Sequence, residues 1–161
     1  MKKRILILML VLGCLFCSVS IGNCKGKLYD LDAFSSYIGK TRAEVRRISP
    51  TFEEFDENCY IVDYQQDGDD FLALAVIFDH YNLVQSVLVL VTKGALPIIG
   101  IEDSMDTVAS FGAVLLGFTG DDSLGTYTDL NGNYIINIKG GITISTTILY
   151  EKLYAVVSTQ K

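Results

Sequence analysis

The spacing of hydrophobic and polar residues changes several times along the chain, and each change marks an element. An apolar run from Ile5 to about Phe16 follows three basic residues. One segment with helical spacing comes next, at 41–49. Beyond it, short runs rich in apolar residues are separated by polar and glycine-containing turns, which is typical of antiparallel β-strands. This order predicts an N-terminal leader followed by a domain of helices and strands.

The helix at 41–49 is predicted from its first turn. Thr41 and Glu44 have the spacing of a capping box, in which each side chain satisfies a backbone donor at the start of the helix. Val45 and Ile48 are expected to share one side of the helix. Its arginines are expected to point into solvent, with an anion site as the alternative: Arg42, Arg46 and Arg47.

Three strands are predicted after this helix, and their short connections favour antiparallel pairing. They are expected at 59–64, 71–79 and 83–91, with a polar turn at 65–70. The middle run, FLALAVIFD, is rich in apolar residues throughout, as in a strand buried on both faces or a central strand.

A second helix is predicted after a connection at 93–101, with a strand at 113–116 as the alternative for its last part. Asp103 is a candidate N-cap for it, and Gly117 a candidate stop. One stripe at helical spacing is expected to face the core: Met105, Val108, Ala109, Gly112, Leu115 and Leu116.

The stretch DLNGNY, at 129–134, allows two interpretations. Asp129, Asn131 and Asn133 alternate as the oxygen ligands of a calcium loop do, but the twelfth position of such a loop needs a glutamate and is Gly140 here. Asn-Gly between two strand-like runs instead predicts a hairpin with a two-residue turn.

That turn sets an expected register for strands at 124–130 and 133–138. Asp129 would lie opposite Tyr134, and Tyr127 opposite Ile136. Two further strands are predicted at 142–150 and 153–159, joined by a turn at Glu151-Lys152.

The two halves of the chain, 37–92 and 103–159, look alike. CYIVDY matches NYIINI, and each set of strands follows a predicted helix. Internal duplication and chance similarity between strands remain alternative explanations. Residues 23–161 are therefore predicted to form a single α+β domain, an antiparallel sheet with short helices on one face, with two repeated helix-plus-strands units as a further possibility.

Residues 1–22 have the layout of a signal peptide: basic residues, an apolar run and a small-residue end. Cleavage near Ser18-Val19-Ser20 is the expected outcome, which places the mature protein in the periplasm, the outer envelope or the medium. An uncleaved membrane anchor is one alternative. Lipidation of Cys14 or Cys24 is another, and it would make the protein a lipoprotein.

Cys24 and Cys59 remain after removal of the leader. An even pair in an exported protein predicts a disulfide bond, with two separate thiols as the alternative. Lipidation of Cys24 would exclude that bond.

The charge of the chain narrows the choice of partner. Removal of Lys2, Lys3 and Arg4 with the leader reduces the 13 basic residues to 10, against 19 acidic ones, and so disfavours nucleic acid. The acidic residues concentrate between positions 53 and 70, either as a solvated loop and strand edge or as a docking surface for a basic partner. The candidate partner surface comprises Glu53, Glu54, Asp56, Glu57, Asp67, Asp69, Asp70 and Tyr81.

The sequence contains few of the residue patterns that are typical of catalytic or metal sites. His80 is the one histidine, no zinc spacing follows the leader, and no phosphate-binding glycine loop is present. Asp69-Asp70 and Asp121-Asp122 are the carboxylate pairs available to a hydrolase. No catalytic residue, cofactor or metal site is predicted.

The stretch Ile38-Gly39-Lys40-Thr41-x-x-Glu44-Val45 resembles the opening of a superfamily of small exported bacterial proteins. That superfamily includes the β-lactamase inhibitor proteins and the small lipoprotein of the outer-membrane β-barrel assembly machine. The resemblance implies a helix followed by antiparallel strands, a unit that occurs twice in the inhibitors. The chain departs from the pattern at Ile48-Ser49-Pro50, where leucine-glycine is usual.

Together these features predict a non-catalytic exported protein that binds another protein, as an assembly factor, an inhibitor or an immunity-type protein. Contact with a membrane is expected only through the leader or a lipid. A carrier of a small apolar ligand between sheet and helices is the alternative, and a carboxylate-based hydrolase ranks third.

Overall fold

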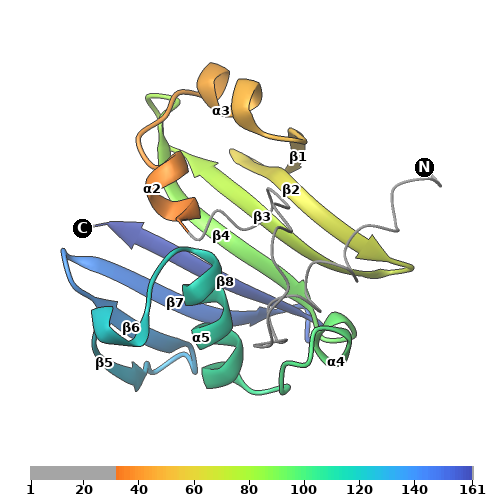
Figure 1. Cartoon of the computed structure of the whole chain (residues 1–161), viewed down its shortest axis with the longest axis vertical. Coiled ribbons are helices and arrows are strands. Elements are labelled where there is room, and N and C mark those ends of the chain that lie inside the picture. The colour runs from red at the N-terminus through yellow and green to blue at the C-terminus, as the bar shows by residue number, and fades with distance from the viewer. Residues whose placement is uncertain (1–31, 161) are drawn as a thin grey trace, which may run out of the picture.

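The computed structural model describes residues 32–160, which form an α+β fold around one antiparallel sheet (Figure 1). The sheet has eight strands in the order β1-β2-β3-β4-β8-β7-β6-β5. The strands are β1 (Glu53–Asp56), β2 (Cys59–Asp67), β3 (Asp70–Phe78), β4 (Val84–Thr92), β5 (Ser123–Thr128), β6 (Tyr134–Ile138), β7 (Ile142–Leu149) and β8 (Leu153–Gln160). The predicted fold class is confirmed at this level.

The helices of the described chain are short and pack on one face of the sheet. They are α2 (Ala33–Tyr37), α3 (Arg42–Ile48), α4 (Ala95–Ile98), α5 (Met105–Leu115) and the 3₁₀ turn η2 (Gly120–Asp122). Buried residues of all four α-helices join one core cluster with residues from six of the strands. None of the helices among residues 32–160 is long and apolar enough to cross a membrane.

Strand β3 shows how the sequence divides between the two faces of the sheet. Val76 and Phe78 belong to the core beneath the helices, whereas Ala73 and Ala75 belong to a smaller cluster on the other face. Because successive side chains alternate between faces, an apolar run such as FLALAVIF buries both sides of the strand. The other members of the smaller cluster also lie on strands. The predicted burial of this segment is confirmed.

The sheet is continuous because β4 and β8, the last strands of each half, pair at its centre. Val89 lies opposite Val156, and both belong to the core beneath the helices. The first strand of each half, β1 or β5, is then left at an outer edge.

Helix α3 begins as predicted, with a complete capping box between Thr41 and Glu44. Val45 is buried, whereas Ile48 is exposed in the last position of the helix, so only Val45 of the predicted apolar side packs in the core. Arg42 was also expected to point outward, whereas its guanidinium lies over the rings of Tyr60 and Phe78.

Helix α5 presents the predicted stripe to the core, but its N-cap is Ser104 rather than Asp103. The Asp103 carboxylate instead accepts a hydrogen bond from the hydroxyl group of Tyr154 on β8. Asp103 therefore makes a contact between α5 and the sheet instead of capping the helix.

The predicted hairpin between β5 and β6 is present, with a different turn. Five residues, 129–133, connect the strands, and among them only Gly132 has a positive φ, of 81°. The Asp129 carboxylate accepts hydrogen bonds from the backbone N–H groups of Asn131 (2.8 Å) and Asn133 (2.9 Å). This side chain closes a longer loop than the two-residue turn.

The longer loop shifts the pairing by one residue. Tyr127 lies opposite Ile135 instead of Ile136, and Thr128 rather than Asp129 lies opposite Tyr134. The sequence had predicted that Tyr127 and Ile136 lie on the same face of the sheet. The one-residue shift places them on opposite faces.

Other boundaries also differ from the predictions. Strand β2 continues to Asp67, so the polar turn predicted at 65–70 shrinks to Gly68 and Asp69. The turn between β7 and β8 is centred on Tyr150 and Glu151, with φ of 52° and 63°. Strand β1 and helices α2 and α4 were not predicted. The signal peptide, the lipidation sites and Cys24 lie outside the described residues.

Candidate functional site

The acidic residues of the candidate surface separate into two groups at opposite ends of β2. Glu53, Glu54 and Asp56 lie on β1, and Glu57 follows in the turn before Cys59. Asp67, Asp69 and Asp70 lie at the other end, around the turn between β2 and β3. Strand β1 lies beside Cys59, Tyr60 and Ile61, so about 20 Å of extended strand, from Ile61 to Asp67, separates the two groups. The predicted surface is therefore not one patch.

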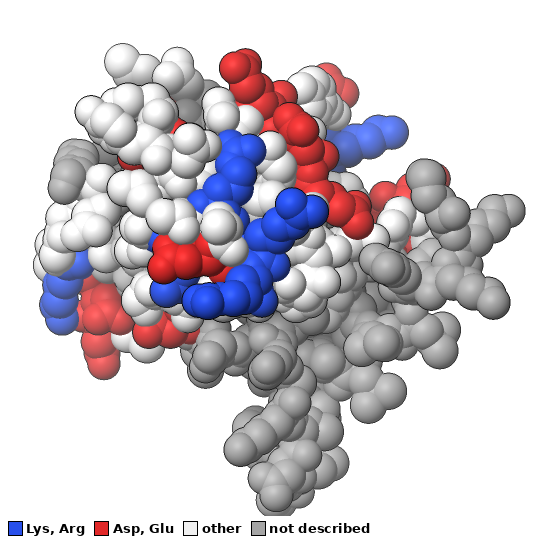
Figure 2. Space-filling view, turned by 90° about the horizontal axis from the view of Figure 1, so that it is seen from above, with Lys and Arg blue, Asp and Glu red and all other residues white. Residues whose placement is uncertain are grey.

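The first group forms what we term the acidic edge, residues 53–57. All four residues of β1 are exposed, and Phe55, among the carboxylates, keeps 42% of its surface accessible. One side of β1 pairs with β2 and the other is an edge of the sheet. Figure 2, which views the molecule from the end carrying β1 and α3, shows acidic side chains beside basic ones.

Tyr81 lies at the same end of the sheet as the acidic edge. Its loop, 79–83, connects β3 and β4, and the Phe78 N–H donates to the carbonyl of Asn58 in the turn after β1. The Asp79 carboxylate fixes the loop by accepting from the N–H groups of Tyr81 (2.8 Å) and Leu83 (2.9 Å). Tyr81 is 72% exposed on this loop.

The second group of acids is partly committed to structure. The Asp70 carboxylate accepts a hydrogen bond from the Thr92 hydroxyl at 2.8 Å, and Thr92 also accepts from the Phe71 N–H. The backbone of Gly94 passes so close that a Cβ there would lie 2.2 Å from the Asp70 carboxylate oxygens. Asp70 thus fixes the end of β4. Asp67 and Asp69 are exposed but lie at the other end of β2, so the candidate surface is reduced to the acidic edge and Tyr81.

Beside the acidic edge, two arginines of α3 lie on aromatic rings. The guanidinium of Arg42 lies 4.6 Å from the Tyr60 ring centre and 4.8 Å from that of Phe78, and it donates to the Tyr60 hydroxyl at 2.6 Å. Phe52 stacks on Tyr60 at 4.7 Å, and Arg46 lies over Phe52 at 6.0 Å. Contact with aromatic faces holds these side chains in place while Arg46 stays exposed.

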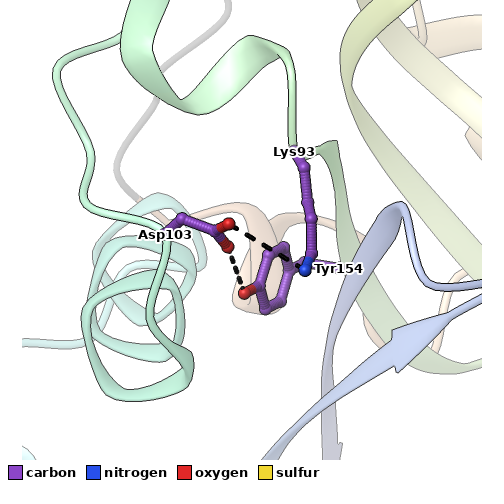
Figure 3. A network of polar contacts seen from close by, with 3 residues as sticks. All are labelled: Lys93, Asp103 and Tyr154. Carbon is purple, nitrogen blue, oxygen red and sulfur yellow. Dashed lines mark hydrogen bonds and ion pairs between the residues drawn. The ribbon is translucent and has the colours of Figure 1, made fainter.

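Within residues 32–160 the one ion pair joins Lys93 and Asp103, at 3.9 Å (Figure 3). Asp103 also accepts from the Tyr154 hydroxyl, and Lys93 lies over the Tyr154 ring. Burial, followed by the hydrogen bond and the charge of Asp103, raises the pKa of Tyr154 to about 12. This network ties the segment before α5 to β8. The carboxylates of the acidic edge have no such partner in the described range.

The structure also reveals polar residues beneath the helices that the sequence analysis missed. Asp63 and Gln65 lie opposite Leu74 and Leu72, which both pack in the core on the helix side. Gln65 is 5% exposed, and neither polar atom of its amide has a hydrogen-bond partner in the part of the chain that the structure describes. Near Asp63, the pKa of Tyr37 is raised by burial and by the Asp63 charge, against a lowering contribution from Ser49.

Asp63 is expected to destabilise the fold at neutral pH. Burial raises its pKa from 3.8 to about 6, so the folded protein binds the proton more tightly than the unfolded chain. The stabilisation that comes from this tighter proton binding is complete below the unfolded pKa, and it is lost as the pH rises through about 6. Asp63→Asn should raise the unfolding free energy at pH 7.5 by roughly 1 to 2 kcal/mol, after allowance for partial exposure.

Urea unfolding at pH 3.5 and pH 7.5 measures this effect. The gain from Asp63→Asn should be much smaller at pH 3.5, where the wild-type carboxyl is largely protonated. Asp67→Asn, at the exposed end of the same strand, is the control and should change stability by less than about 0.5 kcal/mol. Equal gains from Asp63→Asn at both pH values would contradict the assignment.

Two other residues that could have taken part in catalysis, Cys59 and Asp122, are instead buried or hydrogen-bonded within the fold. Cys59 is buried, and burial, followed by the nearby Asp56 charge, raises the pKa of its thiol to about 11. Asp122 accepts from the N–H and hydroxyl of Thr119, which lowers its pKa. The described residues contain no group of three potential metal ligands. The disulfide between Cys24 and Cys59 stays a prediction.

Comparisons with protein-family models, curated proteins and solved structures found no match for this chain.

Proposed function

We propose that the protein is a non-catalytic exported protein that binds another protein through the acidic edge and Tyr81. The observation that carries this proposal is the exposed position of three carboxylates on an edge strand and of a fourth in the turn that follows it, without ion-pair partners in the described range. The corresponding partner has a basic surface. Such charges attract a basic partner over roughly a Debye length, about 8 Å in physiological salt.

Aromatic side chains supply the anchors that charges alone lack. Phe55 lies within the acidic edge and Tyr81 on the loop at the same end of the sheet. Aromatic residues are enriched at binding hot spots because they bury large areas with little loss of side-chain entropy. Surface carboxylates around them increase the association rate, and the aromatics then slow dissociation.

Export is part of the same proposal and rests on residues 1–22, whose composition is that of a signal peptide. An exported binding protein fits the superfamily that the segment at 38–45 resembles. The proposal gives no catalytic role to Asp70 and Asp122, whose carboxylates accept hydrogen bonds from the hydroxyl groups of Thr92 and Thr119.

We also propose that the chain consists of two helix-plus-strands units. The strand order β1-β2-β3-β4-β8-β7-β6-β5 supports this, because it reads as the same four-strand arrangement from either edge. The strands keep nearly the same offset in the sequence: β2 and β6 begin 75 residues apart, β3 and β7 72, and β4 and β8 69. Helices of both units pack in one core cluster.

Charge reversal of the acidic edge tests the binding proposal. Glu53→Lys with Glu54→Lys should reduce capture of the partner at least about tenfold in a cross-linked pull-down from the native cell envelope. Wild-type capture should weaken as salt increases. Mass spectrometry identifies the captured protein and measures the mass of the bait.

The matched control is Asp67→Lys with Asp69→Lys, which makes the same change of charge at the other end of β2. It should leave capture within about twofold of the wild type, because it alters net charge but not the acidic edge. Equal losses in both variants would show that the effect depends only on net charge. Failure to capture any partner above background would overturn the proposal.

A further inference from the structure

Helix α3 lies between the two parts of the proposed binding surface. At the start of the helix, the Arg42 N–H donates to the carbonyl of Asn82 at 3.3 Å, which ties α3 to the loop that carries Tyr81. After the helix, the Thr51 N–H donates to the carbonyl of Val62, and the chain continues directly into β1. Figure 1 shows α3 at this end of the sheet, beside β1. A partner that contacts both the acidic edge and Tyr81 therefore also meets α3.

The charge of α3 is opposite to that of the acidic edge. The helix carries three arginines against one acidic residue, Glu44. The Glu44 carboxylate accepts a hydrogen bond from the Thr41 N–H at 2.8 Å and so belongs to the capping box. Arg46 and Arg47, in the last turn of the helix, are exposed. The one ion pair of residues 32–160 lies elsewhere, so neither arginine is ion-paired within that range.

An aromatic stack fixes the position of two of the arginines. Phe52 stacks on Tyr60 with their ring centres 4.7 Å apart. The Arg46 guanidinium lies over Phe52. The Arg42 guanidinium lies over Tyr60 and donates to its hydroxyl group. A guanidinium held in this way loses less side-chain entropy on binding a carboxylate than a free one does. The exposed Arg46 is therefore prepared to bind an acidic group from outside the chain.

Opposite charges meet where this stack adjoins the acidic edge. Glu54 lies directly opposite Tyr60 in the ladder between β1 and β2. Directly opposite residues of an antiparallel pair project on the same face, so Glu54 projects on the face that carries the aromatic stack. Figure 2 shows acidic side chains beside basic ones at this end of the molecule. One surface therefore presents carboxylates and guanidinium groups next to each other.

We infer that the partner carries an acidic group next to its basic surface, and that Arg46 and Arg47 bind this acidic group. The acidic group belongs to the partner proposed above, so its assignment rests on that proposed function. A uniformly basic partner would be attracted by the acidic edge and repelled by α3 at the same time. Like charges that face each other across an interface oppose binding, so the arginines select against such a partner.

Arg46→Glu and Arg47→Glu, made separately, distinguish the two kinds of partner. The tagged protein is the bait in the cross-linked pull-down from the native cell envelope, and the amount of the protein that the wild type captures is measured for each variant. Each reversal should reduce this amount at least about fivefold, although it makes the chain more acidic. A uniformly basic partner would instead be captured more strongly. Arg47→Glu decides the test, because within the described range Arg47 lies over no aromatic ring and its replacement leaves the stack intact.

Lys152→Glu is the matched control, since it makes the same change of charge at an exposed position between β7 and β8. This turn lies at the opposite end of the sheet from α3, because Leu153 pairs with Thr92, the last residue of β4, whereas α3 contacts the loop before β4. The control should leave capture within about twofold of the wild type. Circular dichroism checks that each variant is folded.

Glu53→Lys with Glu54→Lys separates this inference from the proposed function. A loss of capture in that variant, with unchanged or increased capture in Arg47→Glu, would overturn the inference and leave the proposed function intact. A loss in the arginine variants alone would identify a uniformly acidic partner and contradict both. An equal loss in Lys152→Glu would attribute the effect to net charge and overturn the inference. Failure to capture any protein would overturn the proposed function and the inference with it.

Discussion

Leu116→Ala is expected to lower the free energy of unfolding by about 3 to 4 kcal/mol, the largest effect predicted for a single side chain here. Leu116 is 0% exposed at the C-terminal end of α5 and packs in the core beneath the helices. Its carbonyl accepts from the N–H of Phe34 on α2 at 3.2 Å, so this position also joins α5 to α2. Truncation leaves a cavity in this core, which adds to the cost of the lost apolar contact.

Chemical denaturation followed by circular dichroism measures this loss. Val114→Ala is the control, since Val114 is 45% exposed on the same helix and alanine favours helix formation. It should change stability by less than about 0.5 kcal/mol. A loss below about 1 kcal/mol for Leu116→Ala would contradict the tight packing of this side chain in the core.

Gly112→Ala is expected to destabilise the protein by about 2 kcal/mol, although alanine is the better helix former by about 1 kcal/mol. A Cβ at Gly112 would lie 2.7 to 2.8 Å from the Val156 side chain, Cβ included, so α5 would have to move away from β8. Gly112 therefore sets how closely the helix approaches the central strands.

A double-mutant cycle with Val156→Ala isolates this contact. The double variant should recover at least about 1 kcal/mol relative to the sum of the single effects. Gly120→Ala is the matched control, because a Cβ there meets nothing within 4 Å, and it should be neutral or slightly stabilising. Additive effects in the cycle would show that Val156 is not what excludes a side chain at position 112.

The features predicted well from the sequence depend on neighbouring residues. The capping box of α3 needs Thr41 and Glu44 three positions apart, and the core stripe of α5 needs only helical periodicity. The predicted hairpin register was wrong because another neighbouring side chain changed the turn. Asn131-Gly132 is a strong signal for a two-residue turn, but the Asp129 carboxylate accepts two backbone N–H groups and closes a five-residue loop instead.

The candidate surface was less predictable, because proximity in sequence is not proximity in space. An extended β2 carries the acids before and after it to opposite ends of the sheet. A bulge between Ile61 and Asp63 then places Val62 and Asp63 toward the same core, which simple alternation does not foresee. This is why Asp63 lies beneath the helices and Gln65 follows it there.

Site-specific photo-cross-linking in the native cell envelope tests the proposed binding surface most directly. A photoreactive amino acid replaces Phe55 within the acidic edge or, as the control, Val114 on the exposed side of α5. The prediction is one covalent adduct of discrete mass from position 55, which diminishes when Glu53→Lys and Glu54→Lys are added, and none from position 114. No adduct from position 55, or the same adduct from both positions, would contradict binding through the acidic edge.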